Sequence, residues 1–237
     1  MDNAGYVALT RQTGLLSELR TVAQNVANAS TVGYRREGVV FSEYVKEAGN
    51  ESLSMASAGA HFIDQAQGVL KQTGGTFDVA IEGDGYFRIE TDNGERLSRA
   101  GNFSLSAEGE LVTADGQRVL STDGAAIAIP ADAGRISISG DGTISGDGEE
   151  FARIGVSIAE SRDLRREGNN LFSAINGAQP AEDFNVAQGF LEQSNVNSVT
   201  EIARLIEVQR AYELGQGLME REHNRLTSMI QTLGRSM

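Results

Sequence analysis

The sequence has no cysteine and only two prolines among its 237 residues. Without cysteine the chain forms neither a disulfide framework nor a thiolate metal site, so its fold is indifferent to the redox state of its compartment. The 28 glycines, combined with so few prolines, indicate many tight turns in a folded chain and not a disordered one.

Long apolar runs are also missing. No segment reaches the length of a membrane span, so we expect no membrane insertion. The first twenty residues include Asp2, Arg11 and Glu18 and lack an uninterrupted apolar region, so they do not resemble a secretory signal peptide. We therefore predict a soluble protein that is exported, if at all, without a cleaved signal.

Basic side chains are scarce: 20 lysines and arginines face 33 aspartates and glutamates. Residues 47–198 hold 24 of these acids and ten of the bases, whereas both ends of the chain are close to neutral. Neutral ends can pack against copies or relatives of themselves without repulsion. The absence of a basic patch argues against nucleic acid as a partner.

Both ends of the chain have the apolar spacing of long helices. Residues 198–234 predict one helix, with a capping box at Ser198–Glu201, and residues 4–29 predict another. In each helix apolar residues recur seven apart, which is close to the repeat of a coiled-coil seam. Gly215 and Glu222 interrupt the second row, so an ordinary long core helix is the alternative. The candidate assembly residues are Leu15, Leu19, Val22, Val26, Ile202, Leu205, Val208, Tyr212, Met219, Leu226, Met229 and Leu233.

The middle of the chain predicts β structure. Short alternating runs recur over residues 76–159, and six Asp-Gly or Asn-Gly pairs between them fit two-residue hairpin turns. The predicted fold is α+β, with long N- and C-terminal helices paired as a coiled coil and an antiparallel β domain, a small barrel or sandwich, inserted between them. The predicted domains are 1–34 with 189–237 as a helical, tube-forming domain, 35–75 as an extended connector with a loop at 46–60, and 76–188 as the β domain.

Three motifs carry a resemblance to a known family. Residues 22–35, VAQNVANASTVGYR, resemble the N-terminal signature of bacterial flagellar rod and hook proteins. Residues 74–87, GGTFDVAIEGDGYF, and 97–103, LSRAGNF, resemble the middle segment of the rod proteins, and 188–196 with 205–213 resemble their C-terminal motif. The matching positions include Asn25, Asn28, Thr31, Gly33, Tyr34, Gln188, Gly189, Leu191, Glu192, Ser194, Asn195 and Val196.

The resemblance implies a structural subunit of the flagellar rod in the basal body, crossing the periplasm and transmitting torque. The implied partners are copies of the chain, other proximal and distal rod proteins and the flagellar export apparatus. The modest insert between helix and sheet is similar to that of proximal rod proteins, with a distal rod protein as the alternative.

We find no pattern that predicts a catalytic, cofactor or metal site. The Gly-Asp repeat at 140–148 superficially resembles a calcium-binding repeat, but it is a single copy that two hairpin turns explain. His61 and His223 stand far apart, without cysteine or a nucleophile motif nearby. A secreted calcium- or glycan-binding β protein remains the alternative from another class; we predict no enzyme.

Overall fold

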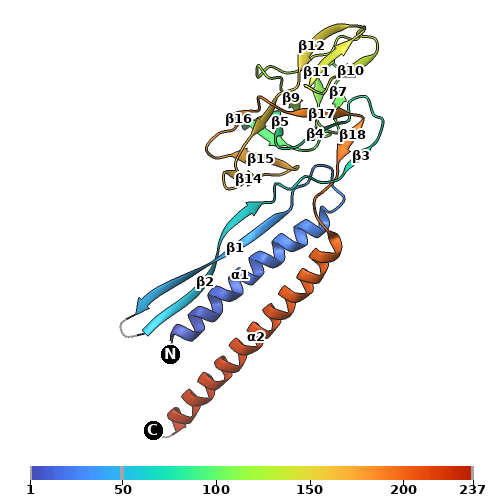
Figure 1. Ribbon diagram of the computed structural model, residues 1–237. Helices are drawn as coiled ribbons and strands as arrows, with labels where there is room; N and C mark the ends of the chain where they lie inside the picture. Colours follow the sequence, from blue (N-terminus) through green and yellow to red (C-terminus); the bar gives the residue numbers. More distant parts are fainter. Residues whose placement is uncertain (1, 49–50, 236–237) are drawn as a thin grey trace. The chain divides into compact units, whose positions relative to one another are not determined.

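The chain folds into two compact units, each built from separate segments of the sequence. The computed structural model describes residues 2–48 and 51–235, with side chains for 8–40, 61–225 and 227–231 (Figure 1). The helical unit comprises Met1–Ala27, Glu37–Phe62 and Asn197–Met237. The β unit comprises Asn28–Arg36 and Ile63–Val196. The chain therefore crosses from one unit to the other four times.

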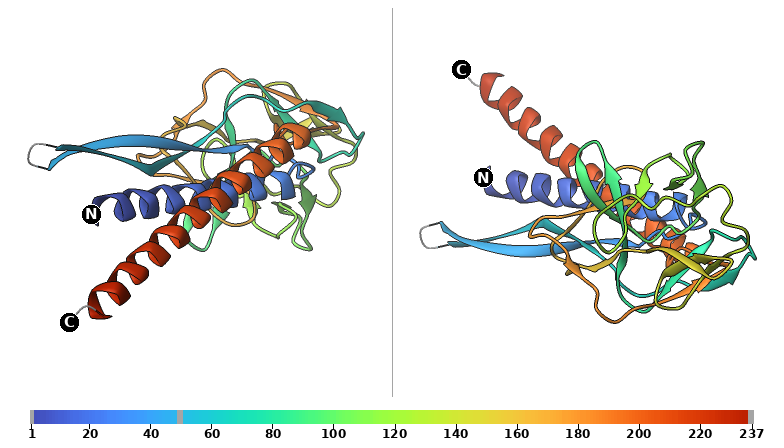
Figure 2. Two further views of the ribbon diagram at one scale, coloured as in Figure 1. Left: turned by 90° about the horizontal axis from the view of Figure 1, so that it is seen from below. Right: turned by 90° about the horizontal axis from the view of Figure 1, so that it is seen from above.

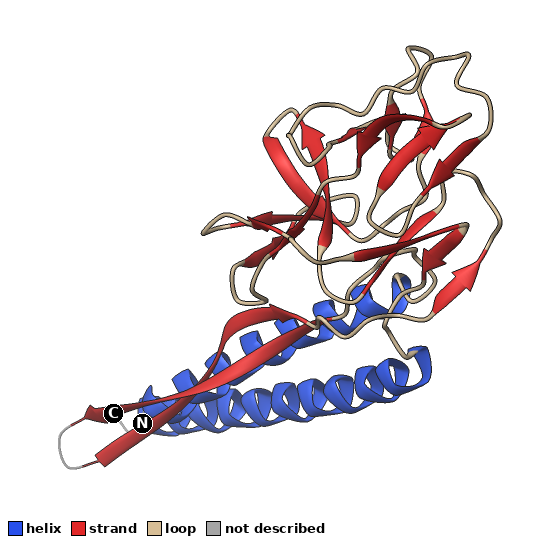
Figure 3. Cartoon of the chain, turned by 45° about the horizontal axis from the view of Figure 1, so that its top comes forward, coloured by secondary structure: helices blue, strands red, loops and turns tan. Residues whose placement is uncertain are grey.

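The helical unit contains two long helices and a two-stranded ribbon. The helices are α1 (Asp2–Ala27) and α2 (Ser198–Arg235), and the ribbon pairs β1 (Glu37–Ala48) with β2 (Glu51–Ile63). In Figure 3 the two helices and the ribbon extend in a similar direction. At roughly 1.5 Å per residue, the 38 residues of α2 span about 57 Å, against about 39 Å for the 26 residues of α1.

The structure is α+β, but the predicted coiled coil between the terminal helices is wrong. Figure 2 shows α1 and α2 crossing and then diverging toward the C-terminal end of α2. A coiled coil needs an unbroken row of apolar side chains that interlock along the seam. In α2 that row is interrupted at Gly215 and Glu222, and Ile202 and Met229 of the predicted seam are exposed to solvent. Specific polar contacts join the two helices, and Val22 of α1 and Val208 of α2 are buried in the same unit.

The capping box predicted at Ser198 is also wrong. Asn197 caps α2, because its Oδ1 accepts the amides of Val199 and Thr200 at 3.1 and 3.2 Å. Asparagine is as good an N-cap as serine, so the helix begins one residue earlier than the motif suggested. The carboxylate of Glu201 instead accepts a hydrogen bond from Asn25 of α1.

The loop predicted at 46–60 lies mostly within the ribbon. Residues 46–48 belong to β1 and 51–60 to β2, whereas residues 49–50 lie outside the described part of the chain. Small and polar residues have weak strand propensity, but strand formation depends more on the partner strand than on the residue itself. A local pattern could therefore not reveal this pairing.

The β unit is made of short antiparallel strands. A nine-stranded sheet has β14-β15-β6-β5-β9-β8-β7 as its main path, with β13 and β16 attached beside β5. A three-stranded sheet orders β10-β11-β12, and two further pairs join β17 to β4 and β18 to β3. The strands are β3 (Leu70–Gln72), β4 (Val79–Glu82), β5 (Tyr86–Thr91), β6 (Gly94–Ser98), β7 (Ser104–Leu105), β8 (Leu111–Val112), β9 (Arg118–Val119), β10 (Ile136–Ile138), β11 (Thr143–Gly146), β12 (Glu149–Arg153), β13 (Val156–Ile158), β14 (Leu164–Arg166), β15 (Leu171–Ala174), β16 (Gln179–Pro180), β17 (Asn185–Gln188) and β18 (Phe190–Glu192).

The positive φ predicted at the glycines of all six Asx-Gly pairs is confirmed, but not every pair is a two-residue hairpin turn: Asp147-Gly148 is one, whereas Asp84-Gly85 joins β4 to β5, which do not pair with each other. These glycines adopt φ values between 80° and 128°, a region that only glycine enters without strain. Between the turns, alternate strand residues face a core in which Phe87 and Phe103 pack edge to face at 5.0 Å. A smaller cluster around Tyr86, Leu97 and Phe172 lies on the other side of β5.

Candidate functional site

In the helical unit, Asn25 joins three elements that are far apart in sequence. Its side chain is fully buried; Nδ2 donates to the carbonyl of Glu37 at 2.8 Å, and Oδ1 accepts the amide of Glu37 at 3.0 Å. Nδ2 also donates to the buried carboxylate of Glu201 at 3.1 Å. One asparagine thus binds α1 to the start of β1 and to the first turn of α2. This arrangement explains why the motif requires an amide that can donate and accept at once.

Farther along the helices, a glycine permits their close approach. Gln12 of α1 is buried, and its Nε2 donates to the carbonyl of Tyr212 at 2.9 Å. A Cβ at Gly215 would lie 2.4 Å from the same Nε2. The residue that interrupts the heptad row is therefore a contact point, because its missing side chain makes room for Gln12.

A salt bridge between the two helices lies between these contacts. Arg204 of α2 donates to Glu18 of α1 from Nε at 2.8 Å and from Nη2 at 2.5 Å. The carboxylate of Glu18 raises the pKa of Arg204. Arg204 is about half exposed, so this ion pair contributes about 0–1 kcal/mol to stability. Its role is to set the register of the helices more than to hold them together.

The face of α2 away from these contacts carries an exposed apolar row. We call Ile202, Ile206, Leu214 and Leu218 the outer row; each side chain is between 45 and 68% exposed. The side chains recur at spacings of four and eight residues, which keeps neighbouring members on adjoining parts of one helical surface. The position between Ile206 and Leu214 at the same spacing is the exposed Arg210, so the outer row consists of two apolar pairs with a charged residue between them. Grouped apolar side chains of this kind are a candidate surface for another protein.

In the β unit, motif residues from both ends of the chain meet at a buried ion cluster. Glu192 lies between Arg35 and Arg99, with Oε1 3.1 Å from Nη1 of Arg35 and Oε2 3.0 Å from Nε of Arg99. None of the three side chains is more than 2% exposed. Glu192 also accepts the amide of Gly68 at 2.9 Å. The cluster thereby links the N-terminal motif, the segment that follows β6 and the C-terminal motif.

Burial acts on Arg99, one member of this cluster. It lowers the pKa of Arg99 to about 10, although Glu192 acts in the opposite direction. The Arg99 guanidinium is held by the carbonyls of Gly85 and Gly83 at 2.8 and 2.7 Å, and it lies 5.8 Å from the centre of the Tyr86 ring. Burial also raises the pKa of Tyr86. With a pKa of about 10, Arg99 is protonated at neutral pH.

Two further motif residues shape the backbone around the cluster. Gly33 adopts a φ of +66°, and a Cβ there would lie 2.3 Å from the carbonyl carbon of Arg99. Asn195 accepts the amide of Arg36 at 2.6 Å and donates to the carbonyls of Asp64 and Ala66 at 3.1 and 2.8 Å. These contacts fasten the segments that enter and leave the β unit to one another.

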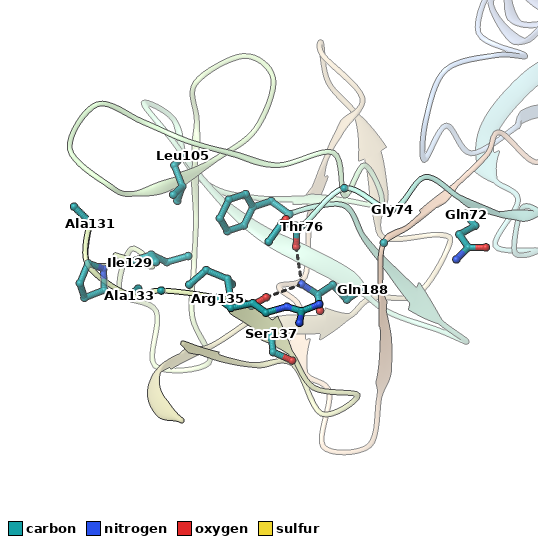
Figure 4. Close-up of a pocket in the computed structure, with 16 residues that line it drawn as sticks. Gln72, Gly74, Thr76, Leu105, Ile129, Ala131, Ala133, Arg135, Ser137 and Gln188 are labelled. Carbon is teal, nitrogen blue, oxygen red and sulfur yellow. Dashed lines mark hydrogen bonds between the residues drawn. The ribbon is translucent and has the colours of Figure 1, made fainter. Parts of the chain in front are cut away.

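A groove of about 910 Å³ lies elsewhere on the β unit (Figure 4). Gln188, one of the lining residues, joins two backbone segments of the groove. Its Nε2 donates to the carbonyl of Thr76 at 2.9 Å, and its Oε1 accepts the amide of Ile138 at 3.1 Å. Figure 4 shows Leu105 on one side of the groove and Ile129 and Arg135 on the other. The lining is Gln72, Gly74, Gly75, Thr76, Phe77, Leu105, Ile129, Pro130, Ala131, Ala133, Gly134, Arg135, Ile136, Ser137, Gln188 and Gly189.

The structure places the candidate residues from the sequence as follows. In α1, Val22 is buried and Leu15, Leu19 and Val26 are half-buried. In α2, Val208 is buried, Leu205, Tyr212 and Met219 are half-buried, and Ile202 and Met229 are exposed; the side chains of Leu226 and Leu233 lie outside the described residues. Among the motif residues, Asn25, Gly33, Tyr34, Gly189, Leu191, Glu192 and Val196 are buried, and Asn28, Thr31, Gln188, Ser194 and Asn195 are half-buried.

The ion partners of Glu192 were not predicted from the sequence. Arg35 and Arg99 both lie inside the quoted motifs but were not named as site residues. The structure shows both arginines fully buried, and arginine is almost never fully buried unless it is paired, but burial is not visible in the sequence. The outer row was also missed, apart from Ile202, because its spacing differs from seven.

The described part of the chain contains neither a membrane-spanning helix nor a cluster of metal ligands. Neither α1 nor α2 combines the length and the hydropathy that a membrane span requires. Among the same residues, no group of three or more acidic, histidine or cysteine side chains is arranged to hold a metal ion.

Comparison with known proteins identifies the family. Models described as "Flagella basal body rod protein", "Flagellar hook protein FlgE/F/G D1 domain" and "Flagellar basal body rod FlgEFG protein C-terminal" match residues 6–35, 80–146 and 187–232. The chain is 39% identical to the flagellar basal-body rod protein FlgF of Mesorhizobium japonicum, over 99% of both chains, and 38% identical to that of Rhizobium meliloti, over the full length of both. It is 34% identical to FlgG of Bacillus subtilis, over 88% of this chain and 90% of the relative. The chain belongs to the flagellar basal-body rod protein family and is a FlgF-like member of it.

Proposed function

We propose that this chain is a structural subunit of the flagellar rod that assembles helically through its terminal helices and transmits torque by packing. Its partners are copies of itself and other rod subunits, and its location is the part of the basal body that crosses the periplasm. Delivery through the flagellar export apparatus, without a cleaved signal, completes the proposal. No step of it requires catalysis or a cofactor.

The observation that carries this proposal is the outer row of α2. Leu214 and Leu218 are 68 and 60% exposed although each is a large apolar side chain. Complete burial of one such side chain contributes about 1.5–3 kcal/mol. A subunit that presents several of them along one helix gains stability by covering them with a neighbour. Contacts that repeat from copy to copy without closing produce an open helical polymer.

The half-buried row that faces α1 has a different role in this proposal. Leu205, Tyr212 and Met219 keep part of their surface uncovered beside α1. We place the helical unit in the tube wall, where neighbouring helices cover both this row and the outer row. The ribbon of β1 and β2 belongs to the same unit, so the tube-forming part extends beyond the two helices.

The test introduces charge into the outer row. A strain that produces only the Leu214→Asp/Leu218→Asp variant is expected to lose completed rods in electron micrographs of its basal bodies, and to lose motility. The control is Gln216→Asp, at an exposed residue outside the outer row; it is compared with the single variant Leu214→Asp, because each adds one negative charge. Normal rods in the double variant, or equal loss in the control, would contradict the assignment of the outer row.

A further inference from the structure

The groove on the β unit is suited to an apolar side chain with a carboxylate beside it. Ile129 is buried at its base, and Phe77 and Ile136 are only partly covered. Arg135 is the only charged residue in the lining, and its guanidinium has no ion-pair partner among the described residues. An unpaired arginine beside apolar surface favours a ligand that brings both features together.

The same unit presents such a combination on its surface. Ile175, in the turn between β15 and β16, is 60% exposed. Asp163 lies next to Ile175, because its carbonyl accepts the amide of Ile175 at 2.9 Å. We call Asp163 and Ile175 the knob. In Figure 1, β15 and β16 lie on the opposite side of the β unit from β3 and β10, which contribute residues to the lining of the groove.

The carboxylate of Asp163 can form an ion pair with a partner, because the neighbouring cations do not pair with it. Within the described residues it makes no ion pair, and it accepts only the side-chain amide of Asn176, at 2.8 Å. The neighbouring cations are already engaged: Arg162 pairs with Glu160 at 2.7 Å, and Arg165 donates to two backbone carbonyls. The knob therefore offers an apolar tip and a free negative charge.

We propose that the knob of one copy docks into the groove of a second copy. Each feature lacks a cover in the single chain, their apolar surfaces and charges are complementary, and they lie on different sides of one unit. A contact between two different surfaces of the same molecule does not close on itself, so repetition gives a linear or helical array. The inference rests on the proposed function, and it adds an interface on the β unit that is separate from the outer row.

Site-specific cross-linking tests this contact, because the chain has no cysteine of its own. One cysteine replaces Ser137 in the groove, and another replaces Gln179, an exposed residue four positions after Ile175 of the knob. A short bismaleimide applied to isolated basal bodies is expected to link successive copies into a ladder on a denaturing gel. The control Ser137→Cys/Asp92→Cys places the second thiol in an exposed turn away from the knob, and either single cysteine alone gives no ladder.

The outcomes separate this inference from the function on which it rests. Intact rods and motility without a ladder, or an equal ladder from the Asp92 control, would overturn the contact between knob and groove while leaving rod assembly in place. A second comparison replaces Ile175 or Val69 by glutamate, since Val69 is also exposed but lies outside the knob and the groove. Ile175→Glu alone is expected to lower motility at least tenfold, measured as the rate of swarm expansion. Equal motility of the Ile175→Glu and Val69→Glu strains would contradict the inference.

Discussion

Replacement of Glu192 by glutamine tests the energetic importance of the buried ion cluster. The variant keeps the shape of the side chain but leaves the charges of Arg35 and Arg99 uncompensated. Removal of one partner from a buried ion pair costs about 3–5 kcal/mol. All three groups are at most 2% exposed, so solvent screening does not reduce this estimate. For a unit of this size about 1 kcal/mol corresponds to roughly 2–4 °C, so the β unit is expected to melt about 6–20 °C lower.

The assay is thermal unfolding of the full chain, followed by circular dichroism in the β region. Glu95→Gln is the matched control, because it removes a carboxylate from the Arg88–Glu95 pair, in which Glu95 is 39% exposed. Such a pair is worth about 0–1 kcal/mol. If Glu192→Gln melts like the wild type, or Glu95→Gln loses as much, the reasoning from burial fails. Joint replacement of all three cluster residues by methionine is expected to recover part of the loss, since no uncompensated charge then remains.

Three other substitutions give measurable outcomes. Gly33→Ala is expected to lower the melting temperature of the β unit far more than Gly116→Ala, because both glycines have positive φ but only Gly33 lies against another backbone. Asn25→Ala is expected to lower the free energy of unfolding of the helical unit by about 1–3 kcal/mol in chemical denaturation, since it leaves buried polar groups unpaired. It is also expected to speed amide hydrogen exchange at the end of α1 and at the start of α2. Gly215→Ala is expected to destabilise the helical unit despite alanine's advantage of about 1 kcal/mol in helices. In a double-mutant cycle, the additional substitution Gln12→Ala is expected to reverse that loss of stability. If the two changes in unfolding free energy simply add, Gln12 and Gly215 are not in energetically significant contact.

Local chemistry accounts for the parts of the fold that the sequence predicted well. An Asp-Gly pair specifies a turn through the freedom of its own backbone, so the glycines at 85, 94, 116, 124, 142 and 148 could be placed from neighbouring residues alone. The two terminal helices were predicted for the same reason, because their apolar spacing is a property of one continuous segment.

Partners distant in sequence account for the rest. Glu201 was interpreted from its neighbours as part of a capping box, but it bonds to Asn25 of the other helix. Gly215 was interpreted as a weak point, although its lack of a side chain is what admits Gln12. Glu192 was recognised within a motif, but its two arginines come from other parts of the chain. No local pattern contains this information, because tertiary contacts select among the roles that each residue can play.

The division of the chain between its two units has a mechanical consequence. The backbone passes between the helical unit and the β unit at residues 27–28, 36–37, 62–63 and 196–197. A domain joined by a single linker would transfer all tension through one peptide segment. Here, force applied to one unit reaches the other through four backbone connections in parallel. Proteolytic cleavage of one connection leaves the other three intact.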